Sequence, residues 1–253
     1  MNVLWISAHP EPRSLNGSLR EEGLRALTEL GHEYRLSDLY AMGWNPVVGP
    51  EDYGHDPAER LHVADASAEA YESGRLSDDI LAEQEKVEWA DALVVQFPVW
   101  WYGLPAILKG WFDRVFVKGF GYGITREDGV ALRYGEGKLA GKRALAVATI
   151  GARASALGPR GVHGDLTELL FPLLHGTFWY TGMAPLPPFV VYAADCLDDV
   201  ECTAKELRSR LETLGTAEPL PFRTQNGGDY DEDLVLRPHL ARGRTGLGVH
   251  WVS

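Results

Sequence analysis

The chain has 253 residues, 45% of them hydrophobic, so it is long enough to bury a substantial core as one α/β domain with or without a tail. Its 36 acidic and 24 basic side chains leave a net charge of −12, which argues against nucleic acid or an anionic membrane as the main partner. No stretch reaches the roughly 20 apolar residues of a membrane span. The beginning, MNVLWISAHP, lacks the features of a signal peptide, so we expect a cytoplasmic protein.

Strand and helix patterns alternate through the first part of the chain. A buried strand is expected at residues 3–7, followed by a polar loop and an apolar helix that begins near Asn16 and ends at Gly31. A second strand is expected at residues 34–36. The connection at residues 40–77 is long, polar and interrupted by three prolines, and its length suggests a functional or partner-binding surface. A helix over residues 78–90 follows, with a serine as its candidate N-cap.

The stretch of residues 90–116, ADALVVQFPVWWYGLPAILKGWFDRVF, gives the clearest indication of a site. Its apolar run at 92–95 has no alternation, which is typical of a strand buried on both faces of a parallel sheet. We expect this strand to stop at Gln96-Phe97-Pro98, because proline cannot donate to a ladder and restricts the residue before it. Three aromatic residues follow, and then a helix after Pro105. Ligands of open α/β sheets bind at the carboxyl ends of strands, and a wall of rings suits a flat, conjugated ligand. Packing of these rings in a core or interface is the alternative.

The second half of the chain continues the same alternation. After an irregular, glycine-rich stretch at residues 119–141, we expect a strand at 143–149 and an apolar helix at 166–178. The last strand, at 184–192, contains three prolines, so its ladder can be regular only over residues 189–192.

The element order defines the expected architecture. The last helix is expected at residues 198–214, and it completes a series of five strands that alternate with helices. This order indicates a flavodoxin-like, doubly wound, five-stranded parallel sheet with helices on both faces. We therefore expect one domain over residues 1–214, and a C-terminal extension over residues 215–253 that packs on this domain or on a second subunit.

The loop after the first strand lacks the Gly-x-Gly-x-x-Gly pattern of a Rossmann dinucleotide site and offers hydroxyls and amides instead. The helix that starts near Asn16 directs free N–H groups at this loop, so a phosphate could bind there with Arg13 and Ser14 as side-chain donors. Alternatively, Ser14 and Asn16 only cap the helix. No residue set has the spacing of a metal site, and the two cysteines, Cys196 and Cys202, are expected to be free structural thiols.

Three segments carry a resemblance to a known family: AHPEPRSLN, LSDDILAEQEKVEWADALVVQFPVWWYGLPAILKGWFDRVF and GPRGVHGDLTELLFPLLHG. They resemble the NAD(P)H:quinone oxidoreductase (DT-diaphorase) family of flavodoxin-fold flavoproteins, and the likeness runs over nearly the whole chain. The resemblance implies a tightly bound FAD, with FMN less favoured, and a homodimer with two active sites at the subunit interface. It also implies that NAD(P)H, as co-substrate, and a quinone-like acceptor bind in turn over the same face of the flavin.

The resemblance further assigns roles to individual residues. The pyrophosphate side of FAD would be held by His9, Leu15, Asn16 and Ser18. The isoalloxazine ring would be lined by Pro98, Val99, Trp100, Trp101 and Tyr102. Backbone N–H groups would be brought to its far edge by Thr149, Ile150, Gly151 and Ala152. Tyr122, in the sequence GFGYG, would be a wall of the substrate pocket.

One position departs from the family pattern. Diaphorase members place a tyrosine six residues before the histidine of the Gly-x-His-Gly-Asp segment, and the two residues take up charge as the flavin is reduced. This chain has His163 but Leu157 at the tyrosine position. His163 and Arg160 are therefore the candidates that stabilise an anionic reduced flavin. A role of His163 as a loop anchor only is the alternative.

The function expected from these features is that of an FAD-dependent NAD(P)H dehydrogenase, which transfers a hydride through the flavin to a quinone or similar flat conjugated acceptor. Neither nucleic acid nor an integral membrane segment is expected. An accessory flavoprotein that binds a membrane transport protein is one alternative, because relatives in the broader family bind potassium-efflux channels. A one-electron flavodoxin-like carrier is a second, which the aromatic wall and the long tail disfavour.

Overall fold

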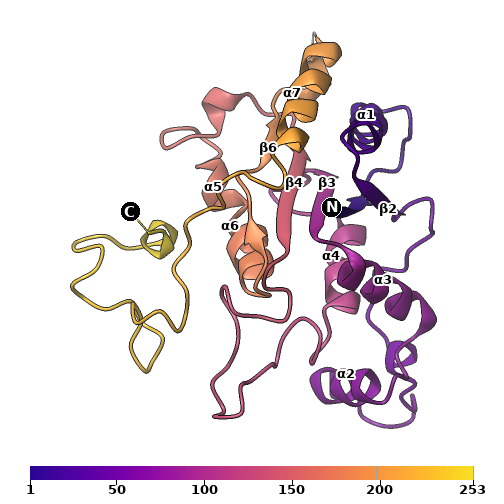
Figure 1. Cartoon of the computed structure of the whole chain (residues 1–253), viewed down its shortest axis with the longest axis vertical. Helices are drawn as coiled ribbons and strands as arrows, with labels where there is room; N and C mark the ends of the chain where they lie inside the picture. Colours follow the sequence, from indigo (N-terminus) through magenta and orange to yellow (C-terminus); the bar gives the residue numbers. More distant parts are fainter. Residues whose placement is uncertain (198, 253) are drawn as a thin grey trace.

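All strands of the sheet run parallel (Figure 1). The computed structural model describes residues 1–197 and 199–252. The strands are β1 (Asn2–Ser7), β2 (Glu33–Asp38), β3 (Ala92–Pro98), β4 (Arg143–Thr149), β5 (Ala184–Pro185) and β6 (Phe189–Val191). They are ordered β2-β1-β3-β4-β5, and β6 also pairs with β4, so that the two short strands share one edge position. This order confirms the flavodoxin-like, doubly wound sheet that the sequence predicts.

Helices cover both faces of the sheet (Figure 1). One core cluster joins the sheet to α1 (Leu15–Glu29) and α7 (Val200–Glu212), while the other joins it to α3 (Asp78–Trp89) and α4 (Ala106–Val115). Along β1, Val3 and Trp5 belong to the first cluster and Leu4 and Ile6 to the second. Both faces are therefore buried, which explains why the strands show no alternation of polar and apolar residues. Within the described part of the chain, no helix combines the length and the apolar character of a membrane span.

Strand β3 ends at Pro98, within the stop that the sequence predicts at residues 96–98. Gln96 accepts a hydrogen bond from the N–H of Ala8, and Val99 donates to the carbonyl of Thr149. Successive residues of a strand direct their polar groups to opposite neighbours. The nitrogen of Pro98 therefore faces the β1 side, beyond the last paired residue of β1, where the sheet needs no donor. Pro98 can therefore be the last residue of the strand without a missing ladder hydrogen bond.

The expected continuous helix at residues 166–178 is interrupted. The structure has three short helices there: α5 (Leu166–Leu169), α6 (Phe171–Leu173) and the π-helix η3 (Leu174–Trp179). Pro172 has no N–H to donate to the carbonyl of Glu168, which ends the first helix. In the last one, the N–H of Tyr180 donates to the carbonyl of His175, five residues earlier. The apolar periodicity predicted the helical segment but not these breaks.

The region of the last strand and last helix also differs from the expectation. The strand expected at residues 184–192 is divided into β5 and β6, because Pro187 and Pro188 lie between them without N–H groups, and the ladder ends at Val191. Helix α7 begins at Val200, and the predicted start at Asp198 lies outside the described residues. Cys196 and Cys202 are free, as expected, but both are exposed rather than part of the core.

The connection at residues 40–77 contains two helices that the sequence did not predict, a 3-10 helix η1 (Pro50–Tyr53) and α2 (Val63–Glu72). It is held by Arg114 of α4, which is buried and donates to the carboxylates of Asp52 at 2.6 Å and Asp79 at 2.7 Å. The same guanidinium lies 4.6 Å from the ring centroid of Trp44. The sequence described this segment only as a long polar connection, and a buried ion pair between Asp52 within it and Arg114 outside it organises its structure.

The C-terminal extension packs against the domain through aromatic residues. The ring of Phe222 lies 4.4 Å from that of Trp251, which the 3-10 helix η5 (Leu247–His250) precedes. The indole N–H of Trp179 in η3 donates to the carbonyl of Arg223 at 3.0 Å. These contacts lay residues 222–251 of the extension beside α6 and η3 (Figure 1).

Candidate active site

The candidate site lies where the connections from the sheet diverge. Strands β1 and β3 are neighbours, but β1 leads to α1 on one face and β3 leads to α4 on the other. In doubly wound sheets this divergence opens a crevice beyond the carboxyl ends of the strands, where ligands bind. The loops that follow β1, β3 and β4 all meet at this edge.

A buried network of amide groups holds these loops together. Gln96 of β3 accepts from the indole N–H of Trp5 at 2.9 Å and donates to the carbonyl of Asn16 at 2.7 Å. The side-chain NH₂ of Asn16 donates to the hydroxyl of Thr149, at the end of β4, at 2.9 Å. All of these side chains are buried, so the first turn of α1 is tied to the ends of two strands.

The first loop is shaped by its helix cap. Ser14 is the N-cap of α1, and its hydroxyl accepts from the N–H of Gly17. A Cβ on Gly17 would lie 1.8 Å from the carbonyl oxygen of Pro12, so only glycine allows the loop to close on the helix. Arg13 instead pairs with Glu11 at 2.9 Å, and this contact lowers the pKa of the Glu11 carboxyl. Of the two suggested phosphate donors, only Ser14 lines the cavity described next.

Two adjoining cavities, of about 360 and 330 Å³, form what we call the slot. They share Val99, Ile150 and Gly151. The first is lined by residues from the loops after β1, β3, β4 and β6: His9, Ser14, Leu15, Asn16, Pro98, Val99, Trp100, Thr149, Ile150, Gly151, Ala194 and Asp195. The second is lined by Val99, Trp101, Tyr102, Ile150, Gly151, Ala152 and His163. Every residue expected to bind the flavin except Ser18 therefore lines the slot.

The aromatic wall of the slot is a strained tight turn. Trp100 and Gly103 exchange two backbone hydrogen bonds, of 3.2 and 3.0 Å, around Trp101 and Tyr102. Both central residues have positive φ, 48° and 62°, as in a type I′ turn, where glycine and asparagine are usual. Trp101 is 97% exposed, so no packing accounts for this conformation. Strain of this kind persists mainly at functional sites.

Tyr102 also provides a phenol for the candidate histidine. Its hydroxyl lies 2.7 Å from Nδ1 of His163, and the two ring centroids are 5.7 Å apart. Leu157, at the position where the family has its tyrosine, is buried and belongs to a core cluster. A tyrosine hydroxyl thus contacts His163 in this chain, and it comes from the loop after β3 rather than from position 157.

The polar groups in the slot fit a flavin. Among the described residues, no acceptor is found for the N–H groups of Gly151 and Ala152, and none of the donors reaches the buried Oδ1 of Asn16. A Cβ on Gly151 would lie 2.9 Å from a carboxylate oxygen of Asp195, so a larger residue there would displace this exposed side chain. Flat aromatic walls, free N–H donors at one edge and a buried acceptor at the other suit a three-ring group with polar edges.

Three of the expected residues do not lie in the slot. Ser18 is exposed on α1, and Arg160 is exposed in the loop that carries His163. Tyr122 lines a separate cavity of about 640 Å³, which it shares with Tyr180. Within one chain the structure therefore brings His163 to the aromatic wall, but not Arg160 or Tyr122.

Sequence reasoning missed Ala194 and Asp195, which belong to the 3-10 helix η4 (Ala194–Cys196) and line the slot. Their position could have indicated this role, because η4 directly follows β6. The carboxyl ends of all parallel strands meet at one edge of the sheet. The three prolines obscured where that last strand ends.

The comparisons with known proteins agree with this architecture. The family model of the flavodoxin-like fold matches residues 1–214. The ribosyldihydronicotinamide dehydrogenase-like protein traD of Penicillium crustosum is 42% identical over 256 residues, covering 99% of this chain and 95% of that protein. NAD(P)H dehydrogenase (quinone) 1 of Rattus norvegicus is 39% identical over 224 residues, covering 87% of this chain and 80% of the rat protein.

Among solved structures, a Klebsiella pneumoniae protein provisionally assigned as a quinone reductase is 46% identical, with a TM-score of 0.95 and complete coverage of both chains. The likeness to this structure thus includes the C-terminal extension. On the family match, the identities and the coverage together, the chain belongs to the NAD(P)H:quinone oxidoreductase family of proteins with a flavodoxin-like fold.

Proposed function

We propose that this protein is an FAD-dependent NAD(P)H dehydrogenase that reduces a quinone or a similar flat conjugated acceptor. The observation that carries the proposal is the slot, in which an aromatic wall faces unpaired backbone N–H groups at the carboxyl edge of the sheet. The names of the relatives support the reaction class, because the Rattus norvegicus protein is a quinone dehydrogenase. When bound, the flavin supplies a carrier that accepts a hydride from NAD(P)H and passes two electrons to the acceptor.

The residues of the slot would bind the flavin and orient it. The N–H groups of Gly151 and Ala152 donate to a polar edge of the flavin, while Asn16 offers its buried Oδ1 to a ligand hydroxyl. Trp101 and Tyr102 form the wall against which a flat ring stacks. Because the strained turn already holds both rings outward, little reorganisation is needed when a ligand enters.

His163 provides the polar group nearest to the wall. If the Tyr102 hydroxyl donates to Nδ1, the proton of the imidazole resides on Nε2, which can then donate into the slot. We infer that this pair stabilises negative charge that develops at the flavin edge, the role that the family gives to its tyrosine and histidine. Arg160 lies in the same loop but is exposed and outside the slot within one chain, and we propose that its positive charge adds to the stabilisation.

The assembly is part of the proposal. A homodimer would bring Tyr122 of one chain to the slot of the other, which accounts for its position in a separate cavity here. Size-exclusion chromatography with light scattering measures this directly, and a monomer at micromolar concentration would contradict it. Consistent with the expectation for this chain, we propose a cytoplasmic location.

The decisive experiment is the absorbance spectrum of the purified protein, with its released cofactor identified. We expect a yellow protein that contains FAD and reduces a simple benzoquinone with NADPH. Release of FMN instead would show that the cofactor is FMN and not FAD. A colourless protein that takes up neither flavin would end the proposal.

The roles of the polar residues are tested by the rate of flavin reduction. Because each variant removes a group that favours negative charge, His163→Ala and Arg160→Ala should both be slower than wild type, by roughly 10- to 100-fold for the histidine. Tyr102→Phe keeps the ring and removes the hydroxyl, so it isolates the contribution of the phenol. Wild-type rates in both alanine variants would exclude the electrostatic role.

A further inference from the structure

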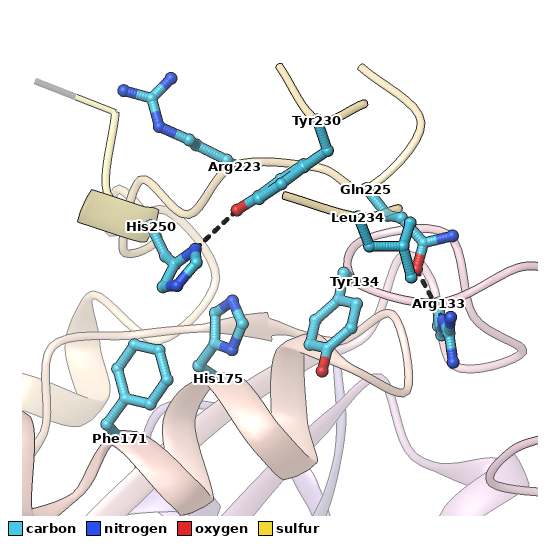
Figure 2. Close-up of a pocket in the computed structure, with 9 residues that line it drawn as sticks. All are labelled: Arg133, Tyr134, Phe171, His175, Arg223, Gln225, Tyr230, Leu234 and His250. Carbon is cyan, nitrogen blue, oxygen red and sulfur yellow. Dashed lines mark hydrogen bonds between the residues drawn. The ribbon is translucent and has the colours of Figure 1, made fainter. Parts of the chain in front are cut away.

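A second cavity, of about 390 Å³, lies where the C-terminal extension crosses α6 and η3 (Figure 2). We call it the tail pocket. Phe171, His175 and Tyr134 lie on the side of the domain, and Tyr230 and Leu234 lie on the side of the extension. It shares no lining residue with the slot. Its volume lies in the range of sites for small organic ligands.

The walls of the tail pocket are mostly rings. The imidazole of His175 stacks on Phe171 with centroids 4.5 Å apart and planes inclined by 18°, and it lies 4.8 Å from Tyr134. On the opposite side, Tyr230 is nearly parallel to His250, and its hydroxyl lies 2.9 Å from Nδ1 of that histidine. Figure 2 shows both pairs bordering the same opening. Such walls suit a planar aromatic ligand.

His175 borders this opening with both ring nitrogens free of hydrogen bonds to the described residues. The residue is only 9% exposed. Burial and the neighbouring His250 lower the pKa of His175 to about 4, so the ring is neutral near pH 7. A neutral imidazole offers one donor and one acceptor. His175 lies in the π-helix, a geometry frequent at functional sites.

The tail pocket also holds a positive charge that no carboxylate balances. The guanidinium of Arg223 is paired with Asp229, but Arg133 is bonded only to the side-chain oxygen of Gln225, at 2.6 Å. Among the described residues, no acidic side chain forms an ion pair with Arg133. Arg133 is half-buried and lies 6.0 Å from the ring centroid of Tyr180, so its remaining N–H groups are available to a carboxylate of a ligand.

The backbone provides an independent indication that the tail pocket is a functional site. Tyr134 and Leu234 have positive φ, 51° and 62°, and so do Trp101 and Tyr102 in the slot. The described residues contain only two further non-glycine positions of this kind, Ala193 and Ala241. Both cavities are thus lined by strained residues, whereas most of the fold has none.

From this geometry we propose that the tail pocket is a second binding site, which takes a planar aromatic molecule with one carboxylate. The ring lies against Tyr134 and His175, and the carboxylate accepts from Arg133 in a bidentate pair. Neutral His175 then donates to, or accepts from, a further substituent of the ring. The site does not depend on the function proposed for the slot.

The test is the binding of 2-naphthoate to the holoprotein by isothermal titration calorimetry, with 2-naphthamide as the uncharged control. We expect naphthoate to bind and naphthamide to bind at least about tenfold more weakly, because the charged pair is lost. The Arg133→Gln variant should bind 2-naphthoate more weakly than wild type by the same factor. Arg126→Gln, in the same loop but exposed and paired with Asp128, is the matched control and should bind as wild type.

His175→Phe retains a ring but removes its donor and acceptor, and it should weaken 2-naphthoate severalfold while the circular dichroism spectrum stays native. His163→Ala should not change the affinity, because His163 lies in the slot. Binding that His163→Ala weakens and Arg133→Gln does not would place the probe in the slot and overturn the proposal. Equal affinities for naphthoate and naphthamide, or no binding of either, would overturn it too.

Discussion

The slot and the tail pocket are lined by similar residues, but these residues differ in their exposure to solvent. Both are lined by tyrosine, histidine and strained backbone, but the wall of the slot is exposed, with Trp101 at 97%, whereas the tail pocket surrounds a histidine that is only 9% exposed. The slot is formed by loops that leave neighbouring strands, and the tail pocket by segments that meet only after the extension has packed. The edge of the sheet can thus hold exposed rings, while the C-terminal extension, which has little regular secondary structure, is held by buried aromatic contacts.

The largest effect on stability is expected from a substitution at the aromatic contacts that hold the C-terminal extension. Phe222→Ala removes a buried ring that packs on Trp251 and His175, so we expect the free energy of unfolding to fall by about 3–5 kcal/mol. Urea denaturation measures this. Trp101→Ala is the matched variant in the slot, and it should change stability by less than about 0.5 kcal/mol because the ring is exposed. Equal losses in the two variants would contradict the comparison.

A smaller effect is expected from the pH dependence of the tail pocket. The pKa of His175 is lowered to about 4 in the folded chain, below its ordinary value of 6.5. The unfolded chain therefore binds more protons between these values, and stability falls as pH decreases from 6.5 to 4, by at most about 3 kcal/mol for this group. His175→Phe should flatten the dependence of the unfolding free energy on pH in this window. An unchanged slope in the variant would show that the histidine is not buried as described.

The smallest effect on stability is expected from relieving the backbone strain in the slot. Tyr102→Gly places glycine at a φ of 62°, so we expect stability to rise by about 1 kcal/mol while flavin affinity falls with the loss of the aromatic wall. Tyr102→Phe keeps the strain and the ring, so its stability should match that of wild type. Urea midpoints and flavin titration measure the two quantities. A glycine variant that is less stable would mean that packing of the ring outweighs the strain.

Much of the slot could be predicted from the sequence, because local patterns carry it. The unalternating strand at Ala92, the proline that precedes the aromatic run and the cap at Ser14 all act within a few residues. All of the expected flavin residues except Ser18 line the slot, since the ends of parallel strands must meet at one edge. The contact between Tyr102 and His163 was not predictable, because 61 residues separate them and neither loop has a regular geometry.

The sequence by itself determined the parallel sheet, its helices and the edge at which a ligand can bind, since apolar periodicity and turn residues act locally. Only the tertiary structure decided the contents of the connection at residues 40–77 and the existence of the tail pocket. Both depend on long-range partners, the pairing of Arg114 with Asp52 and the packing of Phe222 on His175. No local pattern encodes such contacts, because their energy appears only when distant segments leave water together.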